Sequence, residues 1–565
     1  MAEREPLRLA LAQINPVVGG LDRNRQLILD AVDQARAAGA RAVVFPELSV
    51  TGYPPEDLLL RPAFLAAVTR SVSAIAESCR DIDVILGAPV ATDAGLLNAA
   101  LWLREGRVQA QYAKQVLPNY SVFDEQRYFV AGDEPCVVEL AGWRVGLTVC
   151  EDIWQPQPAG AARAAGAELL LNLNASPYHR GKADERLRTV GDRVGETGCA
   201  VVYVNQVGGQ DELVFDGRSF VHDPVQGAQA VLPAWSTGQA LVEARATQDG
   251  GTELVPRPET MHLSGSALLP TLVDPGPEPD ELPERDLYQA LMIGIRDYVA
   301  KNGFPGVLLG LSGGIDSALT AALAVDALGP AAVTAVMMPY RYTASMSIED
   351  AEAQARLLGI EYHEIAIEPM VKSFLAGLED AFSATPAVAG DVTEENLQSR
   401  ARGTLLMALS NRSGRLLLAT GNKSEMAVGY STLYGDMAGG FAPLRDVSKL
   451  WVYRLARWRN TRGAAIPERV IERPPSAELA PGQEDADSLP PYEVLDPVLE
   501  AFVEEEASVA EIVARGFDRA TVERIARMVF IAEYKRRQAA PGVRVSRRAF
   551  GRDRRYPITS GYRAD

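Results

Sequence analysis

The stretch "VLLGLSGGIDSAL", residues 307–319, decides the fold of the second half of this chain. Its first residues are typical of a short buried strand, and apolar residues at helical spacing begin at Ile315. A strand, a glycine loop and a helix in this order predict one unit of a parallel, doubly wound sheet. Because glycines let backbone N–H groups approach an anion beside the positive end of a helix, the loop predicts a phosphate site.

The segments around this loop repeat the alternation of strands and helices. A helix-like segment, 287–303, precedes the loop, and the strand-like segments "AVTAVMMP" and "EYHEIAI" follow it with a helix between them. The segment "RLLLATGNKSE" predicts a further strand that ends in a loop. We therefore expect residues 286–565 to form an α/β domain with a Rossmann-like, doubly wound parallel sheet.

The first half of the chain also alternates strands and helices, but its strands include antiparallel pairs. Two hairpins are predicted, with turns at Glu105-Gly106 and Ala141-Gly142. We expect residues 1–254 to form an α/β domain that contains these pairs. Residues 255–285 are rich in proline and acidic residues in their second half, which predicts a linker between the two domains.

The composition limits the classes of partner. The net charge is −18 (56 basic and 74 acidic residues), which argues against nucleic acid and anionic membranes as partners. Without a long apolar run, the sequence predicts no membrane span and no signal peptide. Four widely separated cysteines argue against a zinc finger or a disulfide framework and favour the cytoplasm. The basic run "YKRRQAAPGVRVSRRAFGRDRR" is either a solvated tail or a contact for phosphates.

One cysteine lies where chemistry is expected. In "WRVGLTVCEDIW", Cys150 follows a predicted strand; Glu47 also follows a strand, and Lys114 follows the second strand of a hairpin. Ligands gather beyond the carboxyl ends of strands in α/β sheets, so these side chains could converge. A thiolate, a carboxylate base and an ammonium are complementary for attack on a carboxamide. Each residue alone is commonly structural, and only the set favours catalysis.

This set resembles the Glu–Lys–Cys triad of the nitrilase superfamily. The resemblance covers residues 6–250 and includes "FPELSVTGYP", "YAKQVLPNYSVFDEQRYFVAGDEP", "VGLTVCEDIW" and "NASPYHRGK". It implies an α-β-β-α sandwich, with Glu47 as base, Lys114 as electrostatic stabiliser and Cys150 as nucleophile. Glu125 corresponds to the additional glutamate that orients the lysine. The glutamine-using members imply substrate contacts at Tyr120, Ser176 and Lys182.

The SGGxDS string resembles the pyrophosphate loop of ATP pyrophosphatases, and the two halves together resemble the glutamine-dependent NAD synthetases. The resemblance implies that ammonia from glutamine amidates deamido-NAD through an adenylate. The implied ATP contacts are Gly310, Leu311, Ser312, Gly313, Gly314, Ile315, Asp316, Ser317, Thr420, Lys449 and Ser476. The implied deamido-NAD contacts are Asn396, Arg400, Glu425 and Lys535, and Asp316 and Glu425 are the implied Mg²⁺ ligands. Leu433 departs from the family pattern, because ammonia-using members carry a lysine there.

Other readings remain open. One is another glutamine-dependent ATP pyrophosphatase. Ala2 argues against the type whose nucleophile is an amino-terminal cysteine, and the lack of a histidine paired with Cys150 argues against the type that uses cysteine with a His–Glu pair. A tRNA-thiolating enzyme would also carry SGGxDS, but the acidic charge argues against it. A nucleotide sensor without catalysis is a third reading. The resemblance further implies a homo-oligomer, at least a dimer through the synthetase domains, and an ammonia channel that couples two active sites.

Overall fold

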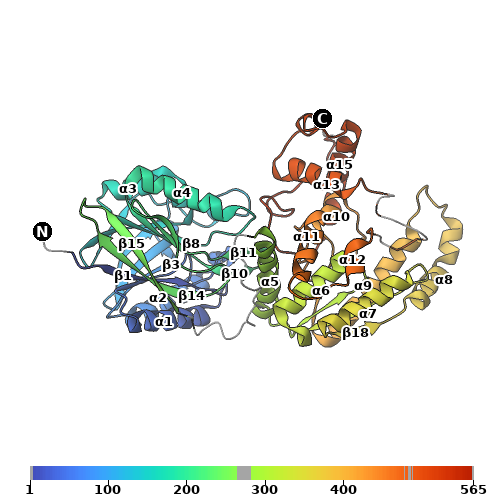
Figure 1. Cartoon of the computed structure of the whole chain (residues 1–565), viewed down its shortest axis with the longest axis horizontal. Coiled ribbons are helices and arrows are strands. Elements are labelled where there is room, and N and C mark those ends of the chain that lie inside the picture. Colours follow the sequence, from blue (N-terminus) through green and yellow to red (C-terminus); the bar gives the residue numbers. More distant parts are fainter. Residues whose placement is uncertain are drawn as a thin grey trace. The chain divides into compact units, whose positions relative to one another are not determined.

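The computed structural model describes residues 4–261, 263, 282–475, 478–480, 485 and 488–562. The chain forms two compact units, one within Met1–Leu269 and one within Pro270–Asp565 (Figure 1). In the part of the chain that the structure describes, none of the helices combines the length and the apolar character needed to cross a membrane.

Two sheets build the first unit. The seven-stranded sheet has the order β15-β14-β1-β2-β3-β4-β5. Its strands are β1 (Leu7–Gln13), β2 (Ala42–Val44), β3 (Asp83–Thr92), β4 (Gly95–Arg104), β5 (Arg107–Ala113), β14 (Gly238–Ala246) and β15 (Thr252–Met261). The six-stranded sheet has the order β13-β12-β9-β8-β7-β6. Its strands are β6 (Cys136–Leu140), β7 (Trp143–Val149), β8 (Leu169–Asn174), β9 (Ala200–Asn205), β12 (Phe220–Asp223) and β13 (Gly227–Ala230). A separate hairpin joins β10 (Val207–Gln210) to β11 (Leu213–Asp216).

Helices cover the outer faces of the two sheets. They are α1 (Leu21–Ala37), α2 (Pro62–Ser78), α3 (Pro156–Ala164) and α4 (Lys182–Thr197). One apolar cluster lies between the sheets and contains Leu9, Val145 and Val202. A second cluster packs α1 and α2 on the seven-stranded sheet, and a third packs α3 and α4 on the six-stranded sheet. The predicted α-β-β-α sandwich is therefore confirmed (Figure 1).

Both predicted hairpins are present, with their turns at the predicted residues. Glu105 and Gly106 join β4 to β5, and Ala141 and Gly142 join β6 to β7. All four residues have positive φ, from 47° at Ala141 to 82° at Gly106. A two-residue turn with positive φ at both positions matches the twist of the flanking strands, which is why glycine takes the second position in each turn.

A four-stranded parallel sheet with the order β18-β17-β16-β19 forms the centre of the second unit. Its strands are β16 (Val307–Gly310), β17 (Val333–Met337), β18 (Glu361–Glu364) and β19 (Leu416–Leu418). The helices between them are α6 (Ile315–Leu328), α7 (Ser345–Leu358), α8 (Glu368–Ala384) and α9 (Thr393–Ser413). The strand order reverses direction between β16 and β19, which confirms the doubly wound fold and places the glycine loop at its switch point.

Eight further α-helices complete the described part of this unit. They are α5 (Pro283–Lys301), α10 (Lys423–Val428), α11 (Lys449–Asn460), α12 (Glu468–Glu472), α13 (Tyr492–Leu499), α14 (Val509–Ala514), α15 (Arg519–Ile531) and α16 (Glu533–Arg536). β15 continues past residue 254, where the first domain was predicted to end, and α5 begins inside the predicted linker. The two ends of residues 255–285 are therefore a strand and a helix. β15 contains two prolines, which argue against a strand when only the sequence is considered.

The basic C-terminal run is packed into the second unit, so the interpretation as a solvated tail is wrong for its buried residues, and contact with phosphates stays a prediction. Arg536 is 3% exposed and donates to Glu533, and Arg544 is 6% exposed and pairs with Asp553. Lys423 donates to the carbonyl oxygen of Arg548. These pairings satisfy the charges of the buried arginines inside the unit, which a count of basic residues does not predict.

Candidate active sites

The strand ends of the first unit bring three predicted residues into one buried region. Glu47 follows β2 and Lys114 follows β5, both in the seven-stranded sheet. Cys150 follows β7 in the six-stranded sheet and begins the short 3₁₀ helix η3 (Cys150–Trp154). Its φ is +42°, an uncommon value for a residue other than glycine, so the chain turns sharply at the cysteine.

A lysine between two glutamates forms the centre of this region. Lys114 Nζ donates to Glu47 Oε1 and to Glu125, at 2.8 Å each. Asn98, which the sequence analysis missed, donates to Glu47 Oε1 at 2.7 Å. Tyr53 Oη donates to Glu125 Oε1 at 2.9 Å. All five side chains are buried, and charges buried so deeply persist only when paired and hydrogen-bonded.

Burial and charge decide the protonation of this cluster. Burial raises the pKa of the Cys150 thiol well above its usual value; Glu47 raises it further and Lys114 opposes both. Burial also raises the pKa of Glu125 to about 7, against the opposing influence of Lys114. Lys114 keeps a raised pKa because the two glutamates outweigh its burial. The thiol is therefore protonated at neutral pH until a neighbouring base accepts its proton.

Of the three predicted substrate contacts, Tyr120 and Lys182 lie near enough to Cys150 for its charge to affect their pKa. Tyr120 Oη donates to Glu151 at 2.8 Å. Ser176 lies just after β8, and its Oγ accepts from Arg186 Nε at 3.1 Å. Lys182 Nζ lies 3.8 Å from the centre of the Trp154 ring. Glu151, for which the sequence supports no role, is 7% exposed and adds a buried carboxylate to this group.

In the second unit, the predicted phosphate loop runs from the end of β16 into α6. Ser317 Oγ accepts from the backbone N–H of Ser312 at 3.2 Å and donates to the carbonyl oxygen of Gly314 at 3.0 Å. Gly313 has a φ of +77°, and a Cβ there would lie 2.4 Å from the carbonyl oxygen of Ser347. A side chain at Gly313 would thus displace the loop, which explains the glycine.

Two predicted carboxylates meet one predicted lysine beside this loop. Lys449 Nζ lies 2.5 Å from Asp316 Oδ2 and 3.2 Å from Glu425 Oε1. Asn422 Nδ2 donates to Asp316 Oδ1 at 2.8 Å. Burial raises the pKa of Glu425 to about 7, and Lys449 opposes this shift. Among the described residues, no three His, Cys, Asp or Glu side chains gather in a ready-made metal site.

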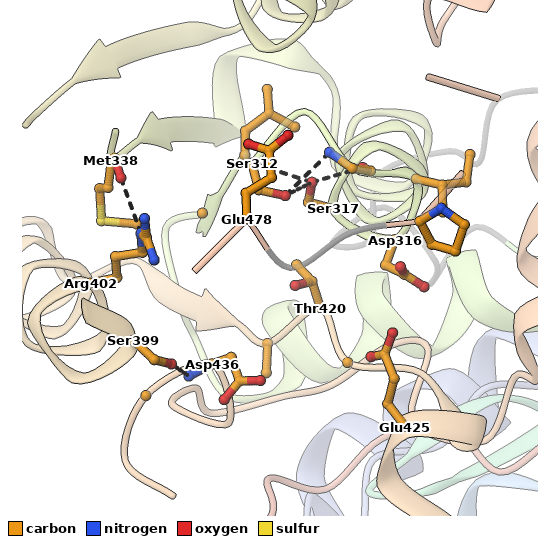
Figure 2. A pocket seen from close by; sticks show the side chains of 18 of the residues that line it. Ser312, Asp316, Ser317, Met338, Ser399, Arg402, Thr420, Glu425, Asp436 and Glu478 are labelled. Atoms are coloured by element: carbon orange, nitrogen blue, oxygen red, sulfur yellow. Dashed lines mark hydrogen bonds between the residues drawn. The ribbon is translucent and has the colours of Figure 1, made fainter. Parts of the chain in front are cut away.

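A cavity of about 280 Å³ joins these groups. It is lined by every predicted ATP residue of the loop except Gly313, and by Thr420, Glu425 and Lys449. Figure 2 shows Arg402 among the lining side chains, and the sequence analysis missed it. Arg402 Nε donates to the carbonyl oxygen of Met338 at 3.1 Å. Burial lowers the pKa of Arg402 to about 10, and the charge of Glu478 opposes this shift, although no described carboxylate lies within ion-pair distance of Arg402.

Three residues predicted to bind the dinucleotide surround one loop and do not line the cavity. Asn396 Oδ1 accepts from Thr432 Oγ1 at 3.0 Å. Arg400 Nε donates to the carbonyl oxygen of Leu433 at 3.2 Å. Lys535 Nζ donates to the carbonyl oxygens of Gly429 and Ser431, at 2.7 Å each. They therefore anchor residues 429–433 beside the cavity.

One further predicted ATP contact, Ser476, lies outside the described residues. Asp436 was not predicted but lines the cavity in Figure 2, and its backbone N–H donates to Ser399 Oγ at 2.9 Å. Asp436 is an exposed residue directly after "YG", and no local pattern in the sequence singles it out.

Comparison with known proteins agrees with this division of the chain. The carbon-nitrogen hydrolase family model matches residues 8–248, and the NAD synthase family model matches residues 287–539. A glutamine-dependent NAD(+) synthetase from Xanthomonas campestris pv. campestris is 50% identical over 562 residues, 98% of each chain. One from Acinetobacter baylyi is 47% identical over 563 residues, 99% of each chain.

A solved structure extends the likeness to the fold. It is glutamine-dependent NAD+ synthetase from Acinetobacter baumannii in complex with ADP, with a TM-score of 0.75 and 43% identity, covering 99% of this chain and 100% of that one. Fold and sites thus define a carbon-nitrogen hydrolase unit fused to an NAD synthase unit. The chain belongs to the glutamine-dependent NAD(+) synthetase family.

Proposed function

We propose that this chain is a ligase that forms NAD⁺ from deamido-NAD, ATP and glutamine. The observation that carries the proposal is that one chain holds a buried Glu47–Lys114 pair beside Cys150 and a phosphate loop in a separate unit. Relatives that match from end to end support the same combination of activities. A sensor that had lost catalysis would have no need to keep the costly buried charges of the first unit.

The first unit hydrolyses glutamine. Cys150 Sγ attacks the carboxamide carbon while Glu47 takes the thiol proton and passes it to the leaving nitrogen, which departs as ammonia. Lys114 stabilises the negative charge that develops on the carboxamide oxygen. Water then attacks the thioester, glutamate leaves and the thiol is restored. Glu125 accepts a second hydrogen bond from Lys114 and helps to keep it charged.

The polar groups around Cys150 suit the amino-acid end of glutamine. Glu151 offers a buried carboxylate for the α-ammonium group, and Tyr120 fixes its position through the 2.8 Å hydrogen bond. Lys182 offers a positive charge for the α-carboxylate, and Ser176 offers polar atoms at the end of β8. Two groups of opposite charge that meet the α-ammonium and the α-carboxylate distinguish an amino acid from a simple amide.

The second unit activates and amidates deamido-NAD. The nicotinate carboxylate attacks the α-phosphorus of ATP, pyrophosphate leaves and an adenylate forms. Ammonia then attacks the activated carbon and AMP leaves, which gives the amide of NAD⁺. The N–H groups of the 312–317 loop and Lys449 face the phosphates, and Arg402 supplies a second cation on the cavity wall. Asn396, Arg400 and Lys535 position the neighbouring loop for the dinucleotide.

The residues present fit Mg²⁺ as the metal that accompanies ATP. Asp316 and Glu425 offer carboxylate oxygens, the ligands that Mg²⁺ prefers, and both already lie within 3.2 Å of the single cation Lys449 Nζ. When bound, Mg²⁺ would neutralise charge on the phosphate oxygens. Lys449 alone, a cation of the protein, already holds the two carboxylates close together.

A three-substrate assay tests the function. The protein is incubated with ATP, Mg²⁺ and deamido-NAD, and NAD⁺ is measured with glutamine and with ammonium as alternative nitrogen donors. Wild-type protein should use both, and Cys150→Ala should use ammonium only. Failure of the wild type with ammonium would refute the synthetase reaction, and retained use of glutamine by Cys150→Ala would refute the role of the cysteine.

We also propose that the two reactions are coupled, that ammonia passes between them through a sheltered channel, and that the enzyme is cytoplasmic and self-associates. Ammonia is largely protonated at neutral pH, so a sheltered route preserves its reactive form.

The four cysteines are free, which suits a reducing compartment. Phe374 and Phe382 on α8 are each 43% exposed, which supports contact with a second copy. Glutamate release that ignored added ATP and deamido-NAD would argue against coupling, and sedimentation measures the oligomer.

A further inference from the structure

Asp152, two residues after the nucleophile, is the feature of the first unit that the proposed reaction leaves unexplained. Its side chain is completely buried and has no ion-pair partner among the described residues. Its two oxygens accept four hydrogen bonds, and each bond comes from a segment next to a reacting residue. Both oxygens are therefore fully used, which is the pattern of a structural acceptor and not of a proton donor.

One oxygen of Asp152 holds the segment that carries Lys114. Oδ1 accepts from the backbone N–H groups of Gln115 and Val116, at 3.0 and 2.9 Å. These two residues directly follow Lys114, at the end of β5 in the seven-stranded sheet. Tyr112, which directly precedes Ala113 at the end of the same strand, donates its Oη to Oδ2 at 2.9 Å.

The other oxygen holds the segment that carries Cys150. Oδ2 accepts from the backbone N–H of Val149, the last residue of β7, at 2.9 Å. Val149 directly precedes Cys150, whose φ of +42° needs support from its surroundings. β7 belongs to the six-stranded sheet, so a single carboxylate joins the end of one sheet to the end of the other.

We infer that Asp152 is a positioning residue that sets the distance between the Cys150 thiol and the Lys114 ammonium across the two sheets. The inference rests on the proposed function, because it concerns the geometry of thiol attack. Hydrogen bonding within each sheet cannot set this distance, since the two residues lie on different sheets. An error of about 1 Å in such a distance can cost about 100-fold in rate.

Asp152→Asn tests the inference with almost no change in volume. The amide has a single acceptor oxygen, so its NH₂ group must face the N–H of Val149 or the N–H groups of Gln115 and Val116. Whichever orientation it takes, at least one backbone donor next to a reacting residue loses its acceptor. Tyr112→Phe is the matched control, because it removes one bond to Asp152 and leaves all three backbone bonds in place.

The measurements separate positioning from mere stability. We expect Asp152→Asn to lower kcat for glutamate release about 100-fold, with the KM for glutamine and ammonium-dependent NAD⁺ formation unchanged. We also expect slower alkylation of Cys150 by iodoacetamide in the folded protein. Tyr112→Phe should stay close to wild type in both assays. If Asp152→Asn only lowers the melting temperature and keeps the wild-type kcat and alkylation rate, the inference is wrong.

The alkylation assay tests the position of Cys150 even if the protein does not hydrolyse glutamine. If wild-type protein released no glutamate, the proposed function would fail, while alkylation of Cys150 would still compare the variants. A large loss of kcat in Tyr112→Phe equal to that in Asp152→Asn would also overturn the inference, because it would show that the backbone bonds are not what matters.

Discussion

Lys449 Nζ lies 2.5 Å from Asp316 Oδ2, although the two residues are 133 positions apart in the chain. The same nitrogen lies 3.2 Å from Glu425. The lysine begins α11 and the aspartate lies in the first turn of α6, so two helix N-termini meet beside the phosphate loop. One cation therefore holds together two carboxylates that would otherwise repel each other.

Lys449→Met should abolish most synthesis of NAD⁺ with both nitrogen donors. Losing a cation that faces a leaving pyrophosphate costs about 100-fold or more in rate. Glutamate release in the absence of ATP should not change, because Cys150 lies in the other unit. Lys372→Met, at an exposed lysine of α8, is the control and should behave as wild type. Normal ammonium-dependent synthesis by Lys449→Met would contradict the assignment.

Arg402→Met should raise the KM for ATP. Arg402 is a cavity-lining cation that forms no ion pair with a carboxylate among the described residues, so an anionic ligand would gain a charge-assisted hydrogen bond there. Such a bond is worth about 1.5–3 kcal/mol, or roughly 10-fold to 100-fold in affinity. Steady-state kinetics with ammonium as donor measures it. Arg412→Met, at the exposed end of the same helix, should leave the KM unchanged.

Lys114→Met and Glu47→Gln should change the reactivity of Cys150 in opposite directions. Glu47 raises the pKa of the thiol and Lys114 lowers it. At a fixed pH below the thiol pKa, Glu47→Gln should therefore increase the thiolate fraction and Lys114→Met should decrease it, each by about 10-fold per unit of pKa. For every variant the rate of alkylation should rise with pH.

Mass spectrometry of the iodoacetamide-labelled peptide that contains Cys150 separates it from the three other cysteines. Both substitutions should abolish glutamate release even though their effects on alkylation are opposite. A shift of the alkylation rate in the same direction in both variants would show that a change of structure, and not the electrostatics of the cluster, controls the thiol.

Glu243→Gln should weaken the first unit at neutral pH but not in acid. Glu243 on β14 accepts from Arg257, Arg245 and Arg8, and these cations lower its pKa to about 2, with Arg257 the largest influence. A lowered carboxyl pKa stabilises the fold above the unfolded value of about 4.5, and this stabilisation is lost as the pH falls toward about 2.

Hydrogen exchange of the backbone amides of β14 measures this effect, because variant and wild type are compared at the same pH. The variant should exchange faster near pH 7, and the difference should shrink below about pH 4. Glu139→Gln, at an exposed position of β6, serves as the control. A difference between Glu243→Gln and wild type that is independent of pH would contradict the electrostatic explanation.

Local patterns were enough to predict many elements of both units. The two hairpin turns, the strand before Ile315 and the glycine loop all depend on residues that are neighbours in sequence. β15 was not among the predicted strands, because prolines argue against a strand; in the described part of the chain β15 is an edge strand that pairs with β14. The burial of part of the basic run near the C-terminus was not predicted, because its partners, among them Glu533 and Asp553, are found only in the folded chain.

The sequence by itself determined the chemical groups of both sites and their places at strand ends. Strand, loop and helix signals are local, and Cys150, Lys114 and the 312–317 loop each follow such a signal. Only the tertiary structure decided which groups meet: Asn98 with Glu47, Arg402 with the cavity, and Asp152 with the segments beside Cys150 and Lys114. These contacts depend on which strands are neighbours and how two sheets stack, and no spacing along the chain encodes either.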